Sequence, residues 1–244
     1  MPRQFQTIIT AAGALPEWKI QGYSGPKNLT PILGQTLLGL AVDSYSCRGS
    51  RTVIAIPGSE FARYESNYSD IAAERQAELV PINSGVKGAL VTALISADNL
   101  DLESPLVIAP GDSYMRYGAQ NYIEEILARD LDAGTVTFKS TGDRWSYVAL
   151  NRDGLVTQVA EKRVIGADAT TGVFVFRTAE TFLHAAEWCL LNKIQTNEMF
   201  YVSSTLNYII SRGGKVGSAE TQRELFNYYS RQEDFDGQAL NGTF

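Results

Sequence analysis

The chain has 244 residues, 44% of them hydrophobic, so it can bury the core of one large domain or two small ones, and general disorder is excluded. The formal net charge is −6, and no run of lysine or arginine interrupts it, which disfavours a nucleic-acid partner. An anionic ligand must therefore be held locally, by a few lysines, backbone amides or a metal ion.

The sequence also carries information about the compartment. The first ten residues, MPRQFQTIIT, lack the long apolar stretch of a signal peptide, and no apolar run approaches the roughly 20 residues that span a bilayer. Cys47 and Cys189 lie in apolar helical patterns, which is typical of buried, reduced thiols. We therefore expect a cytoplasmic protein with no membrane partner. The sequence leaves the oligomeric state open.

Strands and helices alternate through the first half of the chain. A β-branched, apolar strand at residues 5–10 runs into Ala-Ala-Gly, and residues 17–26 are too irregular for a helix. Further strands are predicted at residues 52–57, 79–82 and 105–110, with helices after Gly34 and at residues 60–68 and 88–100. This alternation, which continues to about residue 132, predicts a parallel, doubly wound sheet.

Short strands dominate the second half. They are predicted at residues 135–139, 146–150, 156–160, 171–176 and 215–217, and helices at residues 179–191, 204–211 and 221–229. The fold class is therefore α/β, a Rossmann-like, three-layer αβα arrangement with a mixed, mostly parallel sheet. We expect one domain over residues 1–232, with halves at 1–132 and 133–232, followed by a frayed tail at 233–244.

Three features of the first half suit an anionic ligand. Ala11, Ala12 and Gly13 follow the first strand, and small residues there let backbone N–H groups approach a phosphate. Lys27 follows a proline and is placed to reach back over the strand end, although a solvated lysine is the alternative. Asp112 follows the strand at 105–110, where open α/β sheets bind ligands; it can hold Mg²⁺ or cap the next helix.

Taken in order, these motifs resemble the nucleotidyltransferase family that makes nucleotide sugars. The second half adds four segments to the resemblance. Residues 159–162 (VAEK) resemble the family's Glu-Lys strand motif, and residues 169–176 its glycine-containing strand at the acceptor pocket. Residues 197–201 resemble its Glu-Phe-Tyr segment, and residues 217–220 are similar to its Gly-Thr-Pro-Glu. The resemblance extends from residue 5 to about 226, with the fold of nucleotide-diphospho-sugar transferases.

The resemblance implies an enzyme that moves an NMP group from a nucleoside triphosphate to a phosphorylated small molecule, a sugar 1-phosphate or another phosphate or phosphonate. CMP or UMP is favoured, with a role in capsule or other surface-polysaccharide precursors, and Mg²⁺ is the implied cofactor. The first half would bind the nucleotide and the second the acceptor. Lys27, Asp112 and Lys162 would be catalytic, and Asp112 and Glu220 the metal ligands. The implied nucleotide-binding residues are Ala11, Ala12, Gly13, Lys19, Gly85, Lys87 and Gly88, and the acceptor-binding residues are Tyr147, Glu161, Lys162, Thr171 and Gly172.

One departure from the family pattern leaves alternatives open. Glu17 stands where the family has an arginine that presses on the β- and γ-phosphates. Either Lys19 substitutes for it, the triphosphate is held differently, or turnover is weak. A catalytically silent nucleotide-binding or regulatory homologue is thus one alternative. A GT-A glycosyltransferase is another, although that class uses Asp-x-Asp where this chain has Gly-Asp-Ser. The fingerprints of dinucleotide oxidoreductases and P-loop NTPases are absent from the sequence.

Overall fold

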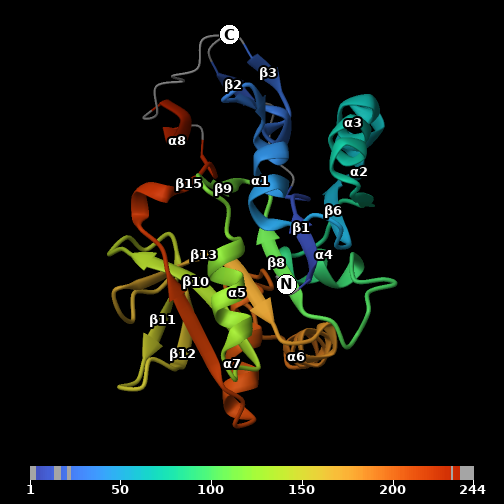
Figure 1. The fold of residues 1–244 in the computed structure, drawn as a ribbon. Coiled ribbons are helices and arrows are strands. Elements are labelled where there is room, and N and C mark those ends of the chain that lie inside the picture. The colour runs from blue at the N-terminus through green and yellow to red at the C-terminus, as the bar shows by residue number, and fades with distance from the viewer. Residues whose placement is uncertain (1–3, 14–17, 21–22, 232, 237–244) are drawn as a thin grey trace.

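The computed structural model describes residues 4–13, 18–20, 23–231 and 233–236. They form a mixed, nine-stranded sheet with helices packed against it (Figure 1). The strand order is β12-β11-β13-β8-β1-β6-β7, and β10 pairs with both β13 and β14. The nine strands are β1 (Gln6–Thr10), β6 (Thr52–Pro57), β7 (Glu78–Ile82), β8 (Leu106–Pro110), β10 (Ala133–Lys139), β11 (Ser146–Leu150), β12 (Val156–Glu161), β13 (Asp168–Phe176) and β14 (Val216–Glu220).

The parallel half of the sheet confirms the predicted alternation. Strand β1 pairs in parallel with β6 and β8, and β6 pairs in parallel with β7. Their carboxyl ends therefore meet at one edge of the sheet, where open α/β folds bind ligands. The helices of this half are α1 (Leu37–Tyr45), α2 (Gly58–Arg63), α3 (Glu65–Arg75), α4 (Ala89–Ile95) and α5 (Gln120–Ala128).

The second half of the sheet is mixed because β13 runs antiparallel to its neighbours. This nine-residue strand pairs with β8 at its carboxyl end, with β11 at its amino end and with β10 along its whole length, where β10 has a register shift between Thr135 and Thr137. Strand β10 in turn pairs in parallel with β14. The helices of this half are α6 (Ala179–Leu191) and α7 (Ser203–Ser211).

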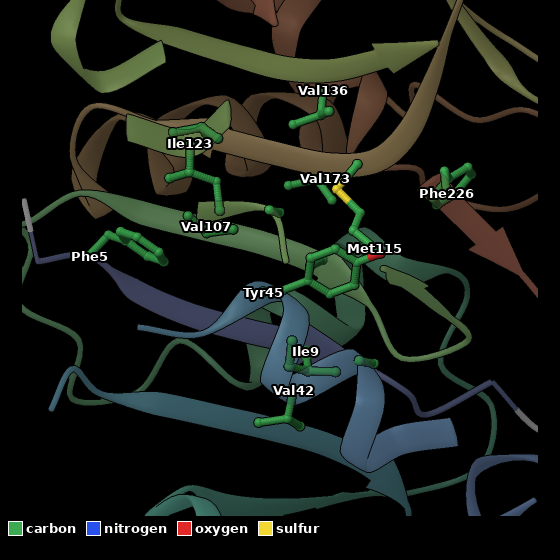
Figure 2. Close-up of a cluster of buried hydrophobic side chains, with 14 of the residues drawn as sticks. Phe5, Ile9, Val42, Tyr45, Val107, Met115, Ile123, Val136, Val173 and Phe226 are labelled. Carbon is green, nitrogen blue, oxygen red and sulfur yellow. The ribbon is translucent and has the colours of Figure 1, made fainter. Parts of the chain in front are cut away.

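Hydrophobic side chains fill both faces of the sheet. Successive residues of a strand point to opposite faces, and Ile8 and Ile9 of β1 accordingly belong to different buried clusters. Figure 2 shows the cluster of Ile9, in which Tyr45 of α1 and Ile123 of α5 approach the sheet. The other cluster joins Ile8 to residues of α4, α6 and α7. The predicted three-layer α/β fold is confirmed.

The predicted helix at residues 221–229 is wrong. Residues Arg223–Leu225 form a single 3₁₀ turn, η2, and Phe226–Tyr228 form strand β15, which pairs antiparallel with β9 (Ser113–Met115). The ring of Phe226 is buried against Phe138 and Trp145, at centroid distances of 5.2 and 5.9 Å. Pairing across the fold therefore overrides the local preference of this segment.

Smaller differences from the predicted elements cluster near the first loop and the chain end. The stretch expected to be irregular contains a hairpin of β2 (Trp18–Ile20) and β3 (Tyr23–Gly25), then η1 (Lys27–Leu29), β4 (Pro31–Ile32) and β5 (Gln35–Thr36). The helix predicted at 60–68 is two helices that meet at Tyr64, and α4 ends short of residue 100.

The tail predicted to fray from residue 233 begins with a short helix, α8 (Glu233–Asp236). Its Phe235 is buried edge-on against Trp18, with ring centroids 5.0 Å apart. Residues 237–244 lie outside the described part of the chain. In the described part, no helix combines the length and the apolar character that crossing a bilayer requires.

Candidate functional site

A cavity of about 460 Å³ opens where β1, β6, β7 and β8 end. Residues that terminate these strands, from Thr10 to Pro110, line it together with Lys27, Asn28 and Asp112. The turn before α4 (residues 83–88) forms a second wall, and Met199 and Tyr201 of the other half contribute a third. The volume suits a small-molecule ligand.

In the first loop (Ala11, Ala12 and Gly13), a close backbone approach limits the side chain at Ala11. The N–H of Gly111 donates to the carbonyl of Thr10 at 3.1 Å, and a Cβ on Gly111 would lie 2.4 Å from the Cβ of Ala11. Gly13 is exposed, with nothing within 4 Å of the place where its Cβ would stand. The loop thus offers backbone close to the cavity, as an anionic ligand requires.

Lys27 and Asp112, predicted separately, meet in one ion pair in the cavity wall. Lys27 Nζ lies 2.8 Å from Asp112 Oδ2, and the lysine side chain is only 9% exposed against 24% for the aspartate. Trp18 covers the same ammonium group, at 5.7 Å from ring centroid to Nζ. A buried ammonium group is stable only when it is paired. The pair therefore explains how a charged lysine is held inside this wall.

The turn before α4 depends on Gly88, whose φ and ψ are 101° and 166°. Backbone of Phe200 crosses directly over it. The Phe200 N–H donates to the Lys87 carbonyl at 3.0 Å, and the Leu90 N–H donates to the Phe200 carbonyl at 3.2 Å. This crossing places Met199 in the cavity wall. Gly85 also lines the cavity, whereas the exposed side chain of Lys87 does not.

Sequence reasoning missed Met199 and Asn28 as cavity residues. Asn28 is 4% exposed, and its Nδ2 donates to the carbonyl of Ala11 at 2.9 Å. Unlike its neighbour Lys27, Asn28 carries no charge that would mark it in the sequence as a binding residue. The glycines at 85 and 88 were the available signal for Met199, since a positive-φ glycine often marks a close backbone approach.

Two of the predicted acceptor residues lie toward this cavity. Lys162 extends its ammonium group over the ring of Tyr201, at 5.2 Å from the centroid, and Tyr201 lines the cavity. Gly172, at φ +84°, packs against Pro110, whose ring is 3.2 Å from the place of a glycine Cβ. Glu161 accepts hydrogen bonds from Ser146 and from Ser203, the latter at 2.9 Å.

Other predicted residues have different surroundings. Tyr147 and Thr171 are buried, and their hydroxyls donate to the carbonyls of Gly142 and Val136, so both pack the second half and neither lines the cavity. Lys19 is exposed on β2 and does not line the cavity. Glu220 also lies away from it and forms an ion pair with Lys139 at 3.2 Å. Glu17 falls outside the described residues.

The donors around Asp112 define what metal the site can hold. Among the described residues there is no group of three or more His, Cys, Asp or Glu able to bind a metal ion. The segment paired with β9 brings Tyr228 and Tyr229 beside Asp112, and the Tyr229 N–H donates to the Asp112 carbonyl at 2.8 Å. Burial, and then the charge of Asp112, raises the pKa of Tyr228, whose hydroxyl therefore stays protonated. Mg²⁺ is commonly held by one or two carboxylates plus substrate phosphates, so Asp112 fits an ion that arrives with a phosphate ligand.

Comparison with known proteins bears on the fold. No protein-family model matches the sequence, and no curated protein does. Solved structures do match. A nucleoside-diphosphate-sugar pyrophosphorylase from Vibrio cholerae RC9 is similar at 16% identity over 95% of this chain and 98% of that chain, with a TM-score of 0.78.

Two further similar structures belong to proteins with other activities. One is the inositol-1-phosphate CTP transferase from T. maritima (15% identity, 97% and 94% covered, TM-score 0.70). The other is a putative glucose-1-phosphate thymidylyltransferase from Bacillus anthracis in complex with a sucrose (14% identity, 98% and 99% covered, TM-score 0.72). The chain therefore has the fold of these proteins over nearly its whole length, as the motifs predicted.

Proposed function

We propose that this chain is a Mg²⁺-dependent nucleotidyltransferase. It would transfer an NMP group from a nucleoside triphosphate to a phosphorylated small molecule, such as a sugar 1-phosphate, and release pyrophosphate. The proposal rests mainly on the Lys27–Asp112 ion pair, which lies in a cavity at the carboxyl ends of β1 and β8 beside the first loop. The shared fold with sugar-nucleotide and inositol-phosphate nucleotidyltransferases supports the proposal.

The residues of the cavity have distinct roles in this reaction. The first loop offers backbone N–H groups to the phosphates, and Lys27 neutralises their charge once its ion pair with Asp112 opens. Asp112 would hold the Mg²⁺ ion that arrives with the nucleotide; the ion supplies positive charge against the phosphate oxygens. Lys162, over Tyr201 at the cavity rim, would attract the phosphate of the acceptor.

The reaction requires few catalytic side chains. The attacking phosphate oxygen of the acceptor is already anionic at neutral pH, so no general base is required, and positioning and charge neutralisation suffice. His184, the single histidine of the sequence, is accordingly free to lie exposed on α6. The proposed NMP group is CMP or UMP, and the proposed setting is the synthesis of surface-polysaccharide precursors; both rest on the sequence motifs.

A catalytically silent nucleotide-binding protein is the second candidate. It is favoured by the surroundings of Asp112, where the described residues hold no group of three or more His, Cys, Asp or Glu and the segment that pairs with β9 supplies Tyr228 and Tyr229. A single metal carboxylate, and an acidic Glu17 in the expected arginine position, both suit binding better than turnover.

Pyrophosphate release separates the two candidates. The protein is incubated with each of the four NTPs, Mg²⁺ and a panel of phosphorylated acceptors, and binding is followed in parallel by the melting temperature, which rises with RT ln(1 + [L]/Kd). We expect release with at least one pair, and a loss of at least about 100-fold in Asp112→Asn, the order seen when one key electrostatic group is removed.

Glu220→Gln is the matched control, because it removes a carboxylate that does not line the cavity. We expect this variant to keep wild-type turnover; a large loss would instead return Glu220 to the metal site. Binding without pyrophosphate release would favour the silent protein. No change in melting temperature with any NTP would refute both candidates.

A further inference from the structure

The last described residues form a strap that packs on the hairpin of β2 and β3. This C-terminal strap consists of residues 229–231 and 233–236, and Figure 1 shows its helix α8 at the same end of the molecule as the hairpin. Phe235 of α8 is buried, and its ring meets the ring of Trp18 edge-on at a centroid distance of 5.0 Å. The same ring packs on Tyr229 at 4.4 Å. Phe235 therefore joins the strap to the hairpin.

Both ring neighbours of Phe235 contact the ion pair of the candidate site. Trp18 is buried, and its ring lies over the Lys27 ammonium group at 5.7 Å, within the reach of a cation–π interaction. The Tyr229 N–H donates to the Asp112 carbonyl at 2.8 Å. One buried ring thus supports a contact with each member of the pair.

A charge clamp fastens the strap to the second half of the chain. Arg144, in the loop between β10 and β11, donates to both carboxylate oxygens of Asp234, at 2.9 and 2.8 Å. The backbone N–H groups of Ser230 and Arg231 donate to Oδ2 of the same carboxylate. A two-bond pairing of this kind fixes orientation as well as position. The residue next to Phe235 is therefore held by the half of the chain that was expected to bind the acceptor.

Trp18 becomes more important to Lys27 when the ion pair opens. In the proposed reaction Asp112 turns to Mg²⁺, and Lys27 then loses the carboxylate that holds it in the structure. The ring of Trp18 does not depend on this carboxylate for its place, because Phe235 and the pairing of β2 with β3 hold it. Ordering a long lysine side chain costs conformational entropy, so a fixed ring that keeps the ammonium group aligned favours phosphate binding.

We propose that Phe235 and Asp234 are positioning residues of the nucleotide site. Phe235 sets the ring of Trp18, which keeps Lys27 aligned after its ion pair has opened. Asp234 holds Phe235 against that ring through the clamp to Arg144. This inference rests on the proposed function. Neither Phe235 nor Asp234 lines the cavity, so both act through Lys27.

A double-mutant cycle between Phe235 and Lys27 tests the proposal. Phe235→Leu keeps an apolar side chain but removes the ring, and Lys27→Met removes the ammonium group. We expect Phe235→Leu alone to raise the Kd of the preferred NTP with Mg²⁺ about tenfold, the order of one buried cation–π interaction. In the Lys27→Met background the rise should disappear, because the ring then has no charge to align. An equal rise in both backgrounds, or none in either, would overturn the proposal.

Fluorine NMR tests the contact without reference to nucleotide. Protein labelled with 5-fluorotryptophan gives one ¹⁹F signal for each of its 3 tryptophans, and the signal missing from Trp18→Phe belongs to Trp18. Phe235→Leu and Lys27→Met should each shift this signal. Its titration with NTP also follows weak binding, so the Kd of Lys27→Met stays measurable. An unshifted Trp18 signal in Phe235→Leu would refute the positioning role.

Asp234→Asn tests the clamp. The amide keeps one acceptor but loses the charge and the second acceptor for Arg144. We expect a severalfold rise in the Kd of the NTP and a shift of the Trp18 signal in the same direction as in Phe235→Leu. Arg144→Gln should reproduce both effects and add little to Asp234→Asn, because the two residues form one clamp. Unchanged Trp18 signals in both variants would overturn the role of Asp234.

Two substitutions provide matched controls. Phe182→Leu removes a buried ring that packs on Phe176 at 5.2 Å in another cluster, so it should lower the free energy of unfolding in urea without changing the Kd or the Trp18 signal. Asp130→Asn removes an exposed partner of Lys215 and should change neither. A wild-type protein that binds no NTP would refute the proposed function. Wild-type binding of NTP, with the same Kd in Phe235→Leu and Asp234→Asn, would refute this inference alone.

Discussion

Replacing Gly88 by alanine should both destabilise the fold and deform the cavity. Gly88 has φ 101° and ψ 166°, a region essentially restricted to glycine, and other residues there cost about 1–3 kcal/mol. The new Cβ would also stand 2.2 Å from the Phe200 carbonyl oxygen and 2.8 Å from its nitrogen. Phe200 must move, which breaks two backbone hydrogen bonds of about 1 kcal/mol each. We expect a loss of about 3–5 kcal/mol in the free energy of unfolding.

Gly85→Ala is the control for this prediction. Gly85 also has a positive φ, of 96°, but nothing lies within 4 Å of its Cβ position, so only the backbone cost of about 1–2 kcal/mol applies. Urea unfolding of both variants, compared at equal m-values, isolates the collision with Phe200. The gap should be about 2 kcal/mol, the contribution of the two hydrogen bonds that only Gly88→Ala breaks, and Gly88→Ala should also lose NTP affinity as Met199 is displaced. Equal unfolding midpoints would refute the reasoning.

Three further predictions concern other regions. Gly111→Ala should lower the melting temperature because its Cβ would meet that of Ala11 at 2.4 Å, and the double variant with Ala11→Gly should recover part of the loss. Burial raises the pKa of Cys189 to about 11, so iodoacetamide should modify this thiol in the native protein only as fast as the protein opens; rapid labelling would contradict its burial. Burial opposes ionisation of Asp234, but hydrogen bonds from Arg144 and from backbone amides outweigh it and lower its pKa. The stability that this carboxylate contributes should be complete above about pH 4 and decline as the pH falls further. Asp234→Asn should show less of this decline in acid unfolding curves.

Elements whose local residue pattern agrees with their packing in the fold were the easiest to predict. The strand Thr52–Pro57 was predicted with the observed bounds, because six consecutive buried residues between two parallel neighbours leave a continuous apolar run. The helix Ala179–Leu191 was also predicted with its bounds, and Thr178 caps it by accepting from the Thr181 N–H. In both cases the local pattern and the tertiary packing agree.

Elements that depend on distant partners escaped prediction. Residues 226–228 form a strand only because β9, more than a hundred positions earlier in the chain, offers an edge. At the site, Lys27 and Asp112 were each predicted from their local motif, but a direct contact between residues 85 positions apart is visible only in the fold. Asn28 carries no motif at all, since its place in the cavity wall depends on its hydrogen bond to the Ala11 carbonyl, 17 positions earlier in the chain.

The packing of Phe235 on Trp18 sets an order for biosynthesis. A ribosome must make nearly the whole described chain before the hairpin that follows the first loop can find its aromatic partner. The same delay applies to β9, next to Asp112, which pairs with β15. Nascent chains that stop before residue 226 would leave Phe138 and Trp145 without the ring that covers them, an apolar surface that chaperones and proteases recognise. The aromatic packing around Trp18 and Phe226 therefore forms only after the last described residues have been made.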